Sequence, residues 1–255
     1  MAQATEAPPP VPQTPPPPRV DPLWTPPYST RPLTLPARVI RADGAIGLDR
    51  PVTTLAGGTR IAASTVAPWL RLGVGYGLTH AVEVGLSTAP LRIEAGARFQ
   101  DISLYGRVRL LGSERMDLGA QVALGYRDGA GFASSYAVLL RWRFEAVRLD
   151  VSPTVDLYVG DVTSADLRVP VDLWWRIADV FAIGLRTGVI APDFSEGRLG
   201  ILGGARAVYS LARDGRPFVD IYAAVDFEPL IHLSGTLFRD DFVVGSVGAQ
   251  AHFGP

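Results

Sequence analysis

The clearest alternation of apolar and polar positions in the chain lies in residues 131–159. Apolar side chains recur at every second position over 136–144 and again over 147–157, on either side of a break at Glu145-Ala146. Successive side chains on a β-strand point to opposite faces, so one face of this hairpin is apolar and the other carries Arg and Asp. Both runs are longer than the roughly five or six residues typical of strands in soluble proteins. This pattern is typical of a transmembrane β-barrel.

Similar alternation continues along the chain and predicts about twelve strands from residue 37 onward, an even number as in bacterial barrels. Short breaks between these strands alternate with breaks that are mostly longer. Because such barrels have short periplasmic turns and longer extracellular loops, we expect an all-β, antiparallel transmembrane barrel with both termini in the periplasm. The predicted strands cover residues 38–49, 66–77, 80–89, 98–111, 116–127, 132–144, 147–158, 165–177, 179–190, 198–211, 217–227 and 241–253.

Aromatic residues on the apolar face gather near the predicted short turns and the C-terminus. Tyr and Trp collect where a membrane meets water, so we expect an aromatic girdle at this end of the barrel. The alternative fold is a soluble sandwich or lipocalin-like barrel, which has no reason to place large aromatics outward at one end only. The predicted girdle residues are Tyr76, Trp142, Phe144, Trp175, Phe181, Tyr209 and Phe253.

The last predicted strand carries a resemblance to a known class. Val247, Ala249, Ala251 and Phe253 alternate, and the aromatic residue is followed only by Gly254-Pro255. This pattern resembles the final-strand signal of Gram-negative outer-membrane β-barrels, a porin-like class. The resemblance implies a place in the bacterial outer membrane, contact with its lipid and lipopolysaccharide, and assembly by the barrel-assembly machinery.

Residues 1–36 form a separate region, because they contain 13 of the 22 prolines. Proline lacks an amide donor and fixes φ, so we expect an extended polyproline II or disordered periplasmic arm, followed by the barrel over residues 37–255. Trp24 and Tyr28 are candidate anchors for a periplasmic or outer-membrane protein partner. A flexible leader without a partner is the alternative.

Composition removes several classes of function. The net charge of −1 gives no support for nucleic-acid binding, which needs a basic excess. The chain has no Cys, which excludes disulfides and thiolate metal sites. Its three His residues lack the converging ligands that a metal site needs. We therefore expect no metal and no cofactor.

Charged residues collect on the polar face of the predicted strands. This face points into the predicted lumen. Twelve tilted strands give a backbone cylinder roughly 24 Å across, so inward Arg side chains would leave a narrow aqueous path. Two interpretations stay open: an electropositive channel for small anions, or an Arg–Asp lattice, with pairs such as Arg143–Asp150 and Arg168–Asp156, that keeps the lumen shut. The predicted lumen-lining residues are Arg71, Glu83, Arg107, Arg109, Arg141, Arg143, Arg148, Asp150, Asp156, Asp166, Arg168, Asp172, Arg176, Arg186, Arg206, Asp220 and Asp226.

These observations favour a non-enzymatic protein, either a narrow porin-like channel or a barrel subunit of a larger envelope complex docked through the Pro-rich arm. One short motif suggests an enzyme instead. His232-Leu233-Ser234 is similar to the catalytic pair of outer-membrane lipid A deacylases, in which an acidic residue orients the His and the His activates the Ser. Gly235 stands where that family has Asn. A soluble β-barrel binding protein is the other alternative.

Overall fold

The structure, a computed structural model, describes residues 28–49, 52–54, 60–62, 66–93, 97–99, 101–127, 131–160, 163–194, 199–213, 216–232 and 243–254. Trp24, Ser234 and residues 1–27 of the predicted arm lie outside these ranges. In chain order the elements are η1 (Tyr28–Thr30), β1 (Ile40–Asp49), β2 (Val52–Thr54), β3 (Arg60–Ala62), β4 (Ala67–Gly77), β5 (Val82–Ile93), β6 (Ala97–Arg98), β7 (Asp101–Gly112), β8 (Met116–Arg127), β9 (Gly131–Phe144), β10 (Val147–Val151), β11 (Thr154–Val159), β12 (Ser164–Ala178), β13 (Phe181–Ala191), η2 (Pro192–Phe194), β14 (Gly200–Arg213), β15 (Arg216–His232) and β16 (Val243–Phe253).

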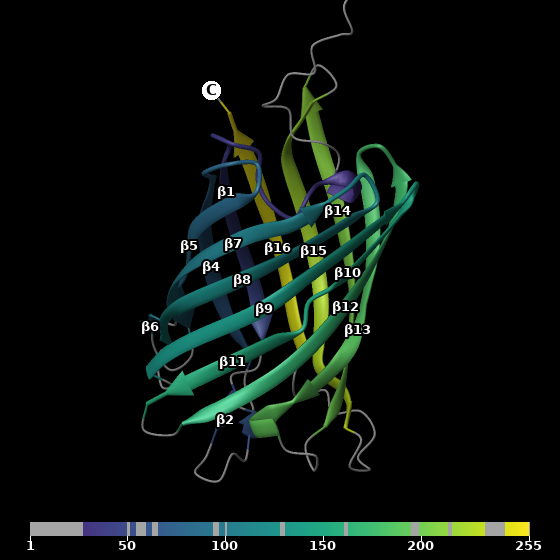
Figure 1. Ribbon diagram of the computed structural model, residues 1–255. Helices are drawn as coiled ribbons and strands as arrows, with labels where there is room; N and C mark the ends of the chain where they lie inside the picture. The colour runs from purple at the N-terminus through teal and green to yellow at the C-terminus, as the bar shows by residue number, and fades with distance from the viewer. Residues whose placement is uncertain are drawn as a thin grey trace, which may run out of the picture.

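Twelve antiparallel strands close into one barrel, which confirms the predicted fold class. The barrel strands pair in chain order, and β1 closes the cylinder by pairing with β16 (Figure 1). β10 and β11 count as one barrel strand, because both lie between β9 and β12. The interruption falls at Ser152-Pro153, where proline has no amide hydrogen for the ladder, although the Val138 amide still donates to the Pro153 carbonyl at 3.0 Å.

The connections differ between the two ends of the barrel. At one end, called here the short-turn end, each connection has four residues or fewer, and the C-terminus lies at this end (Figure 1). At the other end, the long-loop end, β2 and β3 form a small hairpin within the predicted 50–64 loop. β15 also runs beyond its predicted end at residue 227, because Ile231 and His232 continue the pairing with Ile201 and Gly200 on β14 after a register shift.

Hydrophobic side chains face outward along the barrel wall, and charged side chains face inward. Ile46 and Leu104 are each 65% exposed, whereas Glu83 and Asp117 are completely buried. This distribution is the reverse of that in water-soluble proteins and fits a barrel whose outer face meets lipid. Neither short helical turn, nor any other helical segment among the described residues, is long and apolar enough to cross a membrane.

Strand register places the predicted girdle residues in rows near the short-turn end. Ile40 pairs with both Tyr76 and Phe253, and Phe181 pairs directly with Tyr209. Phe253 and Tyr209 are about half exposed, at 54% and 47%. Adjacent rows on β9, β10 and β12 hold Trp142, Phe144 and Trp175.

Candidate functional site in the barrel lumen

Residues 28–36 cross the inside of the barrel at the short-turn end, and we name this segment the crossbar. It starts at β10 and β12, where the Tyr28 ring meets the Trp174 ring edge-on at a centroid distance of 4.9 Å. It ends near β5, where the Leu35 amide donates to Glu83 at 3.0 Å. The sequence predicts that these residues belong to a periplasmic arm and that Tyr28 binds a partner. The structure instead places Tyr28 on the inner wall of the barrel.

Arginines of the wall donate hydrogen bonds to the main-chain carbonyls of the crossbar. The Arg141 guanidinium donates to the carbonyls of Arg31 and Pro32, each at 2.9 Å. Arg107 donates to the Leu33 carbonyl at 2.9 Å, and Arg148 donates to the Tyr28 carbonyl. A guanidinium has five N–H donors and no acceptor, so it suits a proline-containing segment whose backbone is rich in carbonyls and poor in amides.

Carboxylates of the wall accept the polar hydrogens that the crossbar does offer. The Leu33 amide donates to Asp117 at 3.2 Å, in addition to the bond between Leu35 and Glu83. The Arg31 side chain forms an ion pair with Asp220, which also accepts a hydrogen bond from Ser210 at 2.6 Å. The wall therefore supplies partners for both donors and acceptors of the crossbar, while the buried Ser29 hydroxyl has none among the described residues.

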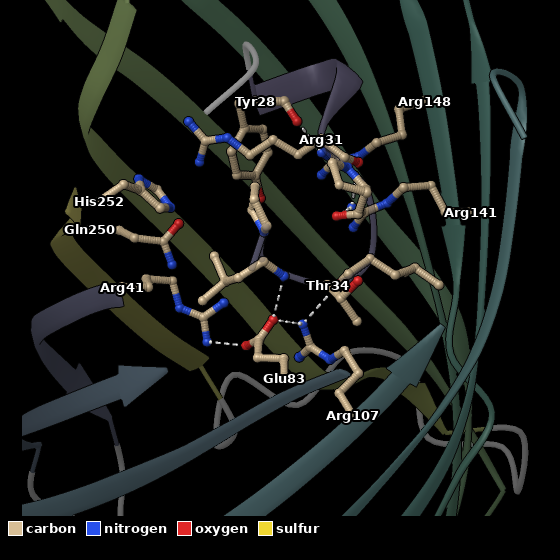
Figure 2. A pocket seen from close by; sticks show the side chains of 14 residues that line it. Tyr28, Arg31, Thr34, Arg41, Glu83, Arg107, Arg141, Arg148, Gln250 and His252 are labelled. Atoms are coloured by element: carbon tan, nitrogen blue, oxygen red, sulfur yellow. Dashed lines mark hydrogen bonds and ion pairs between the residues drawn. The ribbon is translucent and has the colours of Figure 1, made fainter. Parts of the chain in front are cut away.

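The same wall carboxylates fix the arginines at this end of the lumen. Figure 2 shows Arg41 and Arg107 reaching Glu83, at 3.1 and 3.7 Å. Asp43 also pairs with Arg41, and Asp220 pairs with Arg31 of the crossbar. Among the described ion pairs at this end of the lumen, called here the mouth, seven arginines therefore meet five carboxylates, so the mouth has a positive excess. The arginines that share a carboxylate are Arg41 and Arg107 at Glu83, Arg109 and Arg143 at Asp117, and Arg141 and Arg148 at Asp150.

Deeper in the lumen, a lattice of alternating charge joins β12 to β15. Arg186 lies 2.9 Å from Asp172, and Arg206 lies 3.4 Å from Asp172 and 3.0 Å from Asp226. In this lattice two arginines face two carboxylates, so the charge is balanced.

Of the two pairs suggested by the sequence, one forms and the other does not. Arg168 pairs with Asp156. Asp150 pairs with Arg141 at 2.7 Å rather than with Arg143. The reason is the register of the hairpin, which sets Arg141 opposite Asp150 and Arg143 opposite Arg148. The prediction of an Arg143–Asp150 pair was therefore wrong.

The remaining predicted residues lie outside both clusters. Arg71 is exposed and sits over the Trp69 ring at 5.3 Å. Asp166 accepts a hydrogen bond from the Asp193 amide of η2 at 3.1 Å. Arg176 lies on β12, two positions beyond the buried Trp174. Of the His-x-Ser pair, only His232 is described, at the end of β15. Among the described residues, no cluster of three or more His, Asp or Glu side chains could hold a metal ion.

Several residues of the mouth were not singled out from the sequence. Tyr105 donates to Glu83 at 2.8 Å and accepts from Arg41 at 2.6 Å, so it belongs to the Glu83 cluster. Arg41 lies two positions from Asp43 on β1, and Asp117 lies four positions from Gln121 on β8. Each pair therefore faces inward together, and the alternation of inward and outward positions could have identified Arg41 and Asp117. Arg31 has no such signal, because it lies in the proline-rich region.

A pocket of about 170 Å³ remains between the crossbar and the wall. Figure 2 shows Arg41, Gln250 and His252 on one side of it and Arg141 and Arg148 on the other. The Nδ1 atom of His252 is buried and has no hydrogen-bond partner among the described residues. The lining is thus polar and mainly cationic.

Comparisons with known proteins give matches at the level of structure. Neither a protein-family model nor a curated protein sequence matches the chain. The NanC porin superposes with a TM-score of 0.58 at 12% identity, over 84% of this chain and 100% of that chain. The KdgM porin, solved in complex with disordered oligogalacturonate, gives 0.54 at 8% identity, over 84% and 99%. An outer membrane channel from Pseudomonas putida F1 gives 0.56 at 12% identity, over 86% and 97%. At these identities the likeness concerns the fold, and the chain therefore has the fold of Gram-negative outer-membrane porin-like β-barrels.

Proposed function

We propose that the chain is a narrow channel of the bacterial outer membrane that favours small anions. The observation that carries this proposal is the positive excess at the mouth, where seven arginines pair with five carboxylates inside a closed barrel. An Arg-lined constriction with low-dielectric walls concentrates anions and repels cations. The named structural neighbours are porins and a channel, which is consistent with this activity.

The exposure of charged side chains deeper in the lumen favours an open aqueous path, rather than a lumen that ion pairs fill completely. The side chain of Arg168 remains 33% exposed although it is paired with Asp156, and the paired Arg206 remains 21% exposed. Arg71 is also exposed on this inner face. Water therefore reaches charged side chains below the crossbar, as a conducting lumen requires.

Barrels of this type place short turns in the periplasm, so we assign the short-turn end and the crossbar to the periplasmic side. The outward apolar face would then contact membrane lipid. In this orientation, anions that enter from outside pass the lattice first and the arginine-rich mouth last.

Planar-bilayer recording of the full-length protein tests the channel. We expect discrete current steps, and a reversal potential under a KCl gradient that shows a preference for chloride. Arg71→Glu should weaken that preference, because it reverses a charge on the inner face. The matched control is Arg38→Glu, which makes the same change at an exposed position next to the barrel mouth. Absence of current steps, or a preference for potassium, would contradict the proposal.

A further inference from the structure

The crossbar changes the cross-section of the lumen at the short-turn end. A twelve-strand barrel has a backbone diameter of roughly 24 Å. The three residues of the 3-10 turn η1, at about 2 Å each, and six extended residues, at about 3.3 Å each, reach about 26 Å, enough to cross that distance. The pocket of about 170 Å³ lies beside the crossbar, and its wall-side lining includes Arg41, Gln250 and His252. The crossbar therefore narrows the lumen at this level.

The crossbar is anchored along its length and not only at its ends. Tyr28 is held at one end by Arg148 and Trp174, and Leu35 at the other by Glu83. Between them Leu33 is 7% exposed and Thr34 is 3% exposed, and the Thr34 hydroxyl donates to the His80 carbonyl at 2.9 Å. The prolines at 32 and 36 lower the entropy that the segment loses when it is fixed. A segment held at both ends and in the middle acts as part of the wall.

The pocket beside the crossbar has the chemistry of an anion site. Arg41 and Arg107 both face it, and Glu83 is the one carboxylate among its lining residues. The Nε atom of Arg41 is buried and has no hydrogen-bond partner among the described residues. A small anion entering here would accept hydrogen bonds from fixed donors, an interaction stronger than one between neutral groups.

We propose that the crossbar and the wall beside it form the constriction that selects solutes by size and charge, with Arg41 as the main anion-binding side chain. This inference rests on the proposed channel function and assigns its specificity to one place. The expected ligands are small anions, for which inorganic phosphate is the probe.

The size limit is tested by loosening the crossbar without changing the wall. The variant Arg31→Glu/Leu33→Pro/Leu35→Pro removes the ion pair with Asp220 and the two amide donors to Asp117 and Glu83. We expect it to raise single-channel conductance several-fold and to admit uncharged sugars that the unchanged protein excludes in liposome-swelling assays. Arg38→Glu, a single charge reversal outside the crossbar, is the control and should match the unchanged protein. Heat-modifiable gel mobility reports folding, and Arg31→Glu alone serves if the triple variant does not assemble.

The charge selection is tested at Arg41. Arg41→Gln should shift the reversal potential under a KCl gradient toward zero and abolish block of the chloride current by inorganic phosphate. Arg41→Lys keeps the charge and should retain most of the chloride preference, which separates selection by charge from general loosening of the mouth.

The outcomes separate this inference from the function on which it rests. If the loosened variant passes the same solutes as the unchanged protein, or if Arg41→Gln keeps both chloride preference and phosphate block, the constriction lies elsewhere and the channel stands. If neither the unchanged protein nor the loosened variant conducts, the channel function itself fails.

Discussion

The mouth and the middle of the lumen both carry Arg and acidic side chains on the inward face, but their arginines bind different acceptors. At the mouth, Arg107, Arg141 and Arg148 donate to main-chain carbonyls of the crossbar. In the middle, Arg186 and Arg206 bind the carboxylates of their neighbours. Residue composition alone therefore does not decide whether this lumen is filled or left open to water.

The ratio of charges explains the difference. In the middle, two arginines face two carboxylates among the described residues, so their charges balance within the lattice. At the mouth seven arginines pair with five carboxylates, so donors are left over inside the barrel. Burying a charged donor without a partner is costly. The crossbar carbonyls supply the missing acceptors, so the mouth and the crossbar depend on each other.

The largest expected effect comes from breaking the mouth. Asp117 is fully buried and binds both the Leu33 amide and Arg143, at 3.2 and 2.6 Å. Asp117→Ala leaves a buried arginine uncompensated, and we expect a loss of about 3–5 kcal/mol in the free energy of unfolding. Urea unfolding in lipid vesicles measures this. Asp226→Ala, the matched change in the balanced lattice, should cost about 1–3 kcal/mol, because Asp172 still binds both arginines. Equal losses at the two sites would remove the distinction between the regions.

A second variant tests whether both regions share the inner face of a membrane barrel. Leu140 and Leu139 are neighbours on β9, and only Leu139 is buried. Leu140→Arg places a charge on the lipid-facing side and should cost about 2–4 kcal/mol if it lies near the bilayer midplane. Ala137→Arg, on the same inward face as Leu139 but only partly buried, should be far milder, because water reaches charged side chains in the lumen. Folding yield and heat-modifiable mobility are the measurements. Similar damage from both changes would overturn the assigned faces.

A smaller loss of stability is expected when the packing of the Tyr105 ring at the mouth is disturbed. A Cβ atom at Gly85 would overlap the Tyr105 ring, which is tied to Glu83 and Arg41. Gly85→Ala should therefore push the ring from its place at a cost of about 1–3 kcal/mol. Gly106→Ala is the control, because a Cβ there meets nothing within 4 Å. Urea midpoints of the two variants that differ by less than the error would show that Tyr105 is not held in place.

Much of the barrel could be predicted because its signal is periodic. The predicted strand at 116–127 has the same bounds as β8, and the twelve-strand count is confirmed. The pairing of Arg141 with Asp150 could also have been predicted from the sequence. The two-residue turn at Glu145-Ala146 fixes the register, so the partner of each residue on β9 follows by counting from the turn.

The crossbar could not be predicted in the same way. The crossbar is held mostly through its own backbone carbonyls, which every residue has, so no residue type marks it in the sequence. The ion pair of Arg31 with Asp220 joins residues that are 189 positions apart. The protein partner of residues 1–27 and the role of Trp24 stay predictions, as do the contacts with lipopolysaccharide and the barrel-assembly machinery.

Thiol protection at the crossbar tests the account most directly. The chain has no Cys, so Thr34→Cys introduces a single reactive site at a position that is 3% exposed. Arg38→Cys is the exposed comparator just outside the crossbar. With the folded protein in lipid vesicles, a membrane-impermeant thiol reagent should label Arg38→Cys rapidly and Thr34→Cys far more slowly, and urea unfolding should make the two rates equal. Equal labelling rates in the folded protein would contradict the account, because they would show that residues 28–36 do not occupy the lumen.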